Sequence, residues 1–242
     1  MPNSVAGEFL GTFLLILFGN GVVAGALLEK SKAYGAGWLA ITTGWALAVF
    51  VGVTTAIAVG APGELNPAVT LANMLTGDRS TTDGLWHIGA QLAGAMLGAT
   101  IVWLHYLPHW RETADTDAKR GCFCTAPAIR QPVANLISEI IGTFALVLVA
   151  KSLGSAGVTG ATPATNLGAI LVAAIVWGIG LSLGGTTGYA INPARDLGPR
   201  LAHALLPIAG KGHSDWSYAA VPVVGPLLGA ALAVGVWRFV GS

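Results

Sequence analysis

Two Asn-Pro-Ala triplets lie in otherwise apolar sequence and carry most of the polar chemistry of this chain. Asparagine suits the position before a helix and proline suits the first helical position, so each triplet predicts the beginning of a helix. The asparagine amides can donate hydrogen bonds to a small molecule. An arginine follows the second triplet where the first has Val69. No nucleophile–base pair accompanies them, which indicates a transport site and not an enzyme. The residues are Asn66, Pro67, Ala68, Asn192, Pro193, Ala194 and Arg195.

The elements that must position these residues are membrane helices. The chain has 242 residues, of which 54% are hydrophobic and 10% charged, against roughly 25% charged in a soluble domain. Its apolar runs reach the roughly 20 residues that span a bilayer, and they lack the alternation of β-barrel strands. We expect six spanning helices, at about 5–28, 36–59, 85–106, 133–153, 167–187 and 217–239, and two short helices, at about 66–76 and 192–203.

The sequence repeats itself. GEFLGTFLLIL at 7–17 resembles SEIIGTFALVL at 138–148, and the triplets follow in the same order. Each copy holds three spans, so the second copy must enter the membrane inverted relative to the first. The short helices are about half a bilayer long and would meet at the midplane from opposite faces. We expect one membrane domain, with repeat one at about 1–106, a linking loop at about 107–131 and repeat two at about 132–242.

The paired triplets, within NPAVT and NPARDLGP, and the paired ExxGTF helices resemble the major intrinsic protein (aquaporin) family over the whole chain. The resemblance implies an all-α integral membrane fold of six helices and two re-entrant half-helices. It also implies a homotetramer in membrane lipid, with one pore per subunit and without cofactor or metal. The function implied is a passive channel for small uncharged solutes such as glycerol, similar polyols and water, excluding ions and protons.

The family's selectivity filter takes one residue from the second helix, one from the fifth, one before the second triplet and the arginine after it. Matching motif to motif gives Trp45, Gly180, Tyr189 and Arg195. The glycine, the aromatic residue and the acid at Asp196 resemble the aquaglyceroporin, or glycerol-facilitator, branch. Such a filter would also be wide enough for dihydroxyacetone, hydrogen peroxide and undissociated lactic acid. An alternative interpretation makes Trp45 a residue of the interfacial belt or of helix packing.

Physical reasoning about the midplane supports a barrier to charge. Two half-helices that meet there direct the positive ends of their dipoles at one point, which repels cations and protons. Donors on both asparagines would interrupt a chain of hydrogen-bonded water. An arginine at this depth normally marks a pathway; the alternative is an ion pair of Arg195 with Asp196, although Asp196 and Arg200 at i and i+4 are the better pair. Carbonyl groups before the triplets would offer acceptors to the solute, at Gly63, Glu64, Leu65, Ala190 and Ile191.

Three acidic residues lie in segments that should be buried. The resemblance implies that Glu8 and Glu139 are structural supports, which accept hydrogen bonds from the backbone of the two re-entrant loops; the alternative is a role as proton carriers. Glu64 stands where many family members have histidine, which places an added acid beside the pore. Tyr189 stands where phenylalanine is more usual and adds a hydroxyl near the filter.

The linking loop mixes both charge signs, which predicts a solvated loop. Cys122 and Cys124 are too few for a disulfide framework, and a metal site with His105 and His109 would need further ligands. A net charge of +1 gives no reason to expect nucleic-acid binding.

Orientation rests on the resemblance, which implies a cell-membrane protein with both termini in the cytoplasm. The positive-inside rule favours the reverse. The family topology puts few basic residues inside and more outside: Arg79, Lys151 and Arg238 against Lys30, Lys32, Arg111, Lys119, Arg120, Arg130 and Lys211.

Two rival functions use similar elements. A coupled secondary transporter also has inverted repeats and broken helices, but it would usually carry an ionisable residue at the midplane, where this chain has two neutral amides. A structural or sensing membrane protein would show no flux in liposomes.

Overall fold

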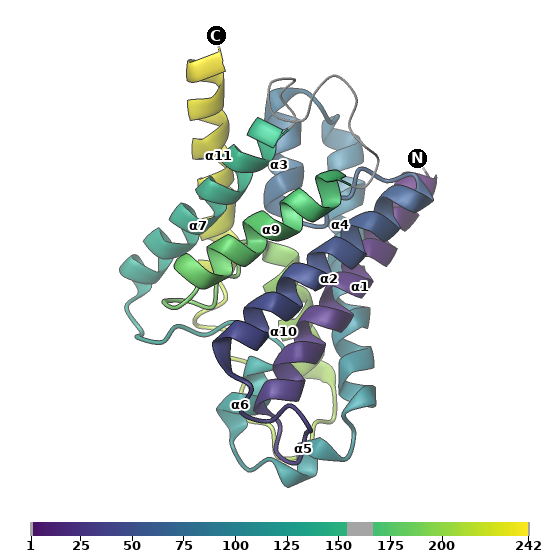
Figure 1. Ribbon diagram of the computed structural model, residues 1–242, viewed down its shortest axis with the longest axis vertical. Coiled ribbons are helices and arrows are strands. Elements are labelled where there is room, and N and C mark those ends of the chain that lie inside the picture. Colours follow the sequence, from purple (N-terminus) through teal and green to yellow (C-terminus); the bar gives the residue numbers. More distant parts are fainter. Residues whose placement is uncertain (1, 154–166, 242) are drawn as a thin grey trace.

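The computed structural model describes residues 2–153 and 167–241. In those ranges the protein is helical and contains no strand, as predicted (Figure 1). Five helices are long and apolar enough to span a membrane, whereas the apolar helix α9 has 16 described residues and directly follows the segment 154–166, which lies outside the described residues. The five are α1 (Pro2–Leu27), α2 (Gly37–Val59), α4 (Thr81–His105), α7 (Pro132–Leu153) and α11 (Val221–Gly241), and α9 is Leu167–Ser182.

Two shorter helices begin at the Asn-Pro-Ala triplets: α3 (Pro67–Thr76) and α10 (Pro193–Leu205). In each, the asparagine before the proline has extended backbone geometry, with φ of −155°, and caps the helix with its own side chain. The oxygen Oδ1 of Asn66 accepts from the N–H of Ala68 at 2.9 Å. Local chemistry alone therefore fixes where both half-helices begin.

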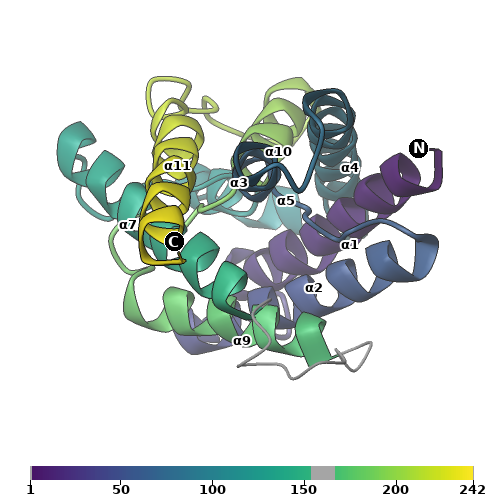
Figure 2. The same ribbon diagram turned by 90° about the horizontal axis from the view of Figure 1, so that it is seen from above.

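The helices pack as two matching sets. Helix α1 lies against α2 and α4, and α7 lies against α9 and α11, while α2 and α9 join the sets. The half-helices are exchanged, because α10 packs on α4 and α3 packs on α11; seen from above, both lie between α4 and α11 (Figure 2). The two ends of the chain lie at the same end of the molecule (Figure 1). This exchange places the beginnings of α3 and α10 together in the interior.

Glycines at spacing four bring the helices within each set close together. A Cβ atom added at Gly94 would lie 2.3 Å from the carbonyl oxygen of Phe9, and one added at Gly229 would lie 2.4 Å from that of Ile140. Both distances are far below van der Waals contact, so only glycine allows these approaches. The α1–α4 and α7–α11 pairs thus use the small-residue packing common in membrane helices.

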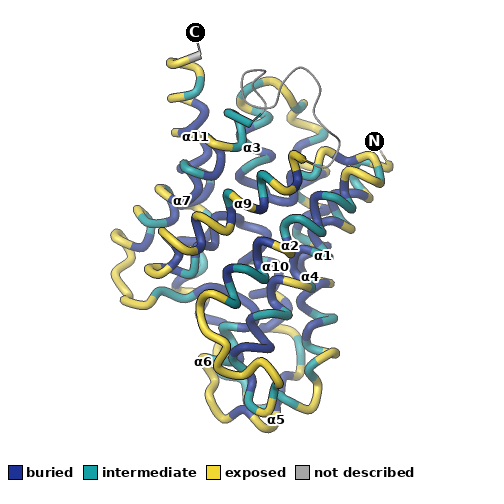
Figure 3. Tube along the Cα trace, viewed as in Figure 1, coloured by how far each residue is buried: buried dark blue, intermediate teal, exposed yellow. Residues whose placement is uncertain are grey.

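The linking loop is more ordered and more buried than its charges suggested. It contains α5 (His109–Glu112) and α6 (Thr116–Gly121), which lie at the end of the molecule opposite the termini (Figure 1). Although most of that end is exposed (Figure 3), Trp110 and Phe123 are buried and their rings lie 5.6 Å apart. The prediction of a solvated loop holds for most of its charged residues, which are exposed, but not for the apolar side chains between them, which pack inward.

Candidate pore and filter

An internal cavity of about 130 Å³ lies where the two half-helices meet. One side of it carries polar groups: Asn66, Asn192, Arg195 and the re-entrant residues 63–65 and 189–191. The other side is hydrocarbon, formed by Leu15, Val49, Val53, Leu146, Val172 and Val176 from α1, α2, α7 and α9. A narrow passage of this amphipathic kind suits a molecule with hydroxyl groups along one edge and CH groups along the other.

The two asparagines are cross-connected. The amide nitrogen of Asn66 donates to the carbonyl oxygen of Ile191 at 2.8 Å, and that of Asn192 donates to the carbonyl oxygen of Leu65 at 2.8 Å. An amide NH₂ has two N–H groups, so each asparagine keeps one for the cavity. The carbonyl oxygens of residues 65 and 191 each have two lone pairs and keep one after this bond. The amide donors and carbonyl acceptors expected at the pore thus stay a prediction, with half of these donors used between the two segments.

Two buried glutamates hold the re-entrant loops from behind. Glu8 on α1 accepts from the N–H groups of Glu64 and Leu65, both at 2.8 Å. Glu139 on α7 accepts from those of Ala190 and Ile191, at 3.0 and 2.8 Å. The loops need such partners, because several of their non-glycine residues have left-handed backbone angles, a conformation that costs energy. These φ values are 51° at Leu65, 37° at Tyr189 and 43° at Ile191.

The guanidinium carbon of Arg195 lies 4.2 Å from the centroid of a Trp45 ring, a cation–π geometry. Trp45 is only 4% exposed, so the alternative of an interfacial-belt tryptophan does not hold. Among the described residues no carboxylate lies within ion-pair distance of Arg195. Gly19 on α1 makes room for the tryptophan, because a Cβ there would lie 2.2 Å from its ring. Sequence reasoning missed Gly19, which has no signal besides being a glycine in a span.

Gly180 and Tyr189 are in close contact. A Cβ at Gly180 would lie 2.9 Å from Cζ of the tyrosine, so the glycine admits the ring. Trp38, which the sequence did not single out, donates its indole N–H to the carbonyl oxygen of Gly180 at 3.0 Å and packs edge-on against Tyr189. The tyrosine hydroxyl is buried and has no hydrogen-bond partner in the part of the chain that the structure describes.

Behind the filter, Asp196 and Arg200 form the predicted i, i+4 ion pair at 2.7 Å, and both are fully buried. All five N–H donors of Arg200 are used, on Asp196 and on the carbonyl oxygens of Thr125, Ser214 and Asp215. Asp196 also accepts from the N–H and hydroxyl of Thr125. The pair therefore ties α10 to two loops that are distant in sequence.

Comparison with known proteins identifies the family of this chain. The family described as Major intrinsic protein matches residues 2–237. The chain belongs to the major intrinsic protein family. It is similar to Glycerol uptake facilitator protein 3 of Lactiplantibacillus plantarum, at 54% identity over 93% of this chain and 92% of that protein. It is 52% identical to the Glycerol uptake facilitator protein of Streptococcus pneumoniae, over 98% and 99%.

A solved structure supports the same fold. The X-ray structure of the aquaglyceroporin from Plasmodium falciparum matches with a TM-score of 0.85 at 27% identity, over 98% of this chain and 95% of that one. Membership of the major intrinsic protein family confirms the prediction of a multi-pass membrane channel and excludes the enzyme class.

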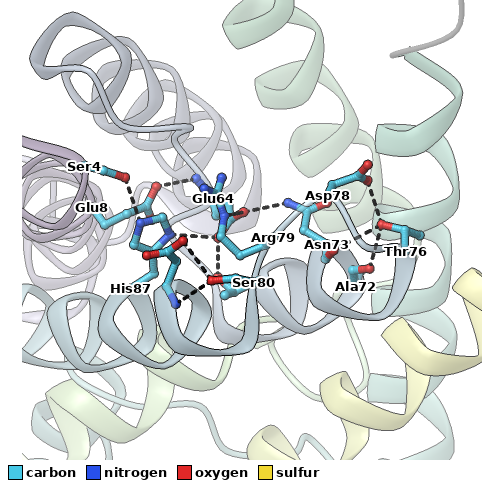
Figure 4. Close-up of polar contacts among 12 residues, drawn as sticks. Ser4, Glu8, Glu64, Ala72, Asn73, Thr76, Asp78, Arg79, Ser80 and His87 are labelled. Carbon is cyan, nitrogen blue, oxygen red and sulfur yellow. Dashed lines mark hydrogen bonds and ion pairs between the residues drawn. The ribbon is translucent and has the colours of Figure 1, made fainter. Parts of the chain in front are cut away.

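Glu64, the added acid expected beside the pore, is among the residues that line the cavity. Its carboxylate is 3% exposed and bonds to residues of α3 and α4 (Figure 4). Sequence reasoning missed its partner His87, because nothing links a residue in a loop to a histidine on the next span.

The thiols and the histidines of the linking loop form no site. Cys122 and Cys124 are buried free cysteines, and burial raises the pKa of Cys124 to about 12, which leaves the thiol protonated and unreactive. Within the described ranges the only cluster of metal-ligating types is Glu8, Glu64 and His87. Both carboxylates there already accept hydrogen bonds, so this cluster does not fit a metal ion.

Proposed function

We propose that this member of the major intrinsic protein family is a passive channel for glycerol and similar small uncharged polyols, with water as a further permeant. The observation that carries the proposal is the cavity with one hydrocarbon wall and one wall of amides, carbonyls and a guanidinium. A polyol passing through it would exchange water for these polar groups while its CH groups face the valines and leucines. The names of its close relatives point to the same solute.

The roles of the site residues follow from their places. Arg195 donates to solute hydroxyls and repels cations, and Tyr189 and Trp45, over which the guanidinium lies, form an apolar corner beside it. Gly180 leaves room for that corner. Asn66 and Asn192 each donate one N–H to the solute at the midplane, where the positive ends of α3 and α10 also face. Selectivity in such pores combines diameter, lining polarity and an electrostatic barrier.

We further propose that the chain works as a homotetramer in the cell membrane, with one pore per subunit and both termini in the cytoplasm. The common location of the two termini fits this topology. Exposed apolar side chains on the outer faces, such as Leu47 on α2 and Leu181 on α9, suit contact with lipid or with neighbouring subunits. The matching packing of the two helix sets supports a single domain built from two inverted repeats.

Stopped-flow light scattering on proteoliposomes tests the proposal. We expect glycerol flux well above that of protein-free liposomes, linear with the gradient, and no current in a planar bilayer. An Arg195→Ala variant serves as the control, because it should admit ions more readily while keeping both asparagines. Uptake that requires a proton or sodium gradient would indicate a coupled transporter, and proton conductance by the wild type would contradict the midplane barrier.

A further inference from the structure

The carboxylate of Glu64 has hydrogen-bond partners on α3, in the α3–α4 turn and on α4 (Figure 4). Oε1 accepts from Nδ2 of Asn73 at 2.7 Å and lies 3.4 Å from Nε of Arg79. Oε2 accepts from the hydroxyl of Thr70 at 2.7 Å and lies 3.3 Å from Nδ1 of His87. Four partners on one buried side chain are more than packing requires.

The partners of Glu64 are hydrogen-bond donors. The amide nitrogen of Asn73 and the guanidinium of Arg79 can only donate. Nδ1 of His87 faces the carboxylate and is assigned as a donor to it, and the other ring nitrogen of His87 lies 2.8 Å from the Ser4 hydroxyl. The carboxylate of Glu64 is therefore held by groups from α3, the α3–α4 turn and α4.

The same residue is held on its opposite side. The N–H of Glu64 donates to Glu8, and the carbonyl oxygen of Leu65 accepts from Asn192. Gly63, Glu64 and Leu65 all line the cavity, and Leu65 has the costly left-handed backbone. The place of these carbonyls in the passage thus depends on the side chain at position 64 as well as on Glu8.

The network also reaches the other repeat. Oδ1 of Asn73 accepts from Nζ of Lys151, at the end of α7, at 2.7 Å. Lys151 bonds in turn to Asp78, and this hydrogen bond lowers the pKa of Asp78. A second cavity of about 190 Å³ lies beside the network and is lined by Gly63, Glu64, Asn73 and Lys151 among others. Gly63 and Glu64 line both this cavity and the one at the filter, so the polar chain lies beside both.

We propose that Glu64 is a positioning residue that sets the solute selectivity of the channel. Its carboxylate fixes the carbonyls of residues 63–65 relative to Asn66, and hence the spacing of the acceptors that a permeating molecule meets. A polyol with several hydroxyls must match that spacing, whereas a water molecule needs one acceptor at a time. Loss of the carboxylate then reduces glycerol flux more than water flux. This inference rests on the proposed glycerol channel.

The test compares Glu64→Ala with Glu64→Gln. Glutamine can turn its oxygen to Asn73 and Arg79 and its NH₂ to Thr70 and to His87, which accepts once its proton moves to the other ring nitrogen. Alanine keeps none of these bonds. Glycerol and water permeabilities are measured on the same proteoliposomes, so the amount of folded protein cancels in their ratio. We expect alanine to lower the glycerol-to-water ratio about 2- to 10-fold, the factor that corresponds to one net hydrogen bond, and glutamine to stay within about twofold of the wild type.

Asp117→Ala is the matched control, because it removes a carboxylate that is 73% exposed and should leave the ratio unchanged. A Glu64→Ala protein with the wild-type ratio, or with both fluxes lowered equally, would overturn the proposal and reduce Glu64 to a structural residue. If Glu64→Ala does not assemble, Asn73→Ala takes its place, because it removes one donor to Glu64 and the link to Lys151. The proposal then requires Asn73→Ala to lower the glycerol-to-water ratio by the same factor. Absence of glycerol flux from the wild type would defeat the proposed function instead.

Discussion

The two re-entrant segments share one construction and differ in what surrounds it. When the triplets are aligned, Leu65 corresponds to Ile191, and both have left-handed backbones whose N–H groups bond to a buried glutamate. Each carbonyl then accepts from the asparagine of the other segment. This shared part sets the geometry of the midplane, and it is the same from either side.

The anchoring of each segment differs. The first is anchored by an acid in the loop itself, Glu64, whereas the aligned residue of the second is Ala190. The second is anchored by Asp196 on its half-helix, where the first has Thr70. Near the filter, the second segment has Tyr189 and Arg195 where the first has Gly63 and Val69. The proposed filter side chains Tyr189 and Arg195 thus belong to the second segment, whereas the first segment contributes the carbonyls that we propose Glu64 to position.

Removing the shared glutamates should have the largest effect. Glu139→Ala leaves two buried N–H groups and the Thr187 hydroxyl without an acceptor, and Glu8→Ala leaves two N–H groups and the amide of Gln91, which donates to Glu8 at 2.8 Å. Each lost bond to a charged group costs about 1.5–3 kcal/mol. We expect both variants to lose most assembled protein, and to a similar degree, as measured by yield and thermal unfolding in detergent. Normal assembly of either variant would contradict the view that both glutamates support their segments in the same way. That glutamate would then have only an ordinary packing role.

The distinct anchor of the second segment comes next. Arg200→Met removes five donors and leaves Asp196 as a buried charge without its partner, which costs about 3–5 kcal/mol. We expect a lower unfolding temperature and a loss of both glycerol and water flux. Arg79→Met is the matched control at the first segment, because its guanidinium is partly exposed and lies 3.4 Å from Glu64. Equal destabilisation by the two variants would contradict the view that the segments are anchored differently.

Some parts of the fold and of the site could be predicted from the sequence and others could not. The half-helices were predictable, because Asn66 and Asn192 cap them with local bonds that any Asn-Pro pair could form. The pairing of Asp196 with Arg200 follows from helix periodicity. The space that Gly19 gives Trp45 and the partners of Glu64 could not be predicted, because they join segments that meet only in the folded chain. The burial of Phe123 in the linking loop could not be predicted for the same reason. The charged residues beside it are visible in the sequence, but the residues that cover it come from distant parts of the chain.

The smallest effect on stability, and the sharpest on selectivity, should come from exchanging side chains at the filter. Gly180→His alone pushes the new side chain against Tyr189 and Thr42, since even a Cβ would lie within 3.0 Å of them. With Tyr189→Ala added, the imidazole takes the place of the phenol and replaces an apolar surface by a polar one. The double variant should fold and conduct water, because Arg195 and both asparagines remain. Glycerol flux should fall at least about tenfold, since the CH groups of a polyol lose their apolar corner.

Tyr189→Phe is the control for this exchange, because it removes only a hydroxyl that has no partner in the described part of the chain. It should change glycerol and water fluxes less than about twofold, well below the effect of losing a buried paired group. Undiminished glycerol flux through a well-folded Gly180→His/Tyr189→Ala protein would place the constriction away from the second segment. The first segment, with Gly63 at the aligned position, offers no side chain that could replace the filter there. Such a result would therefore contradict a filter on the second segment and would leave the carbonyls that Glu64 positions as the determinant of selectivity.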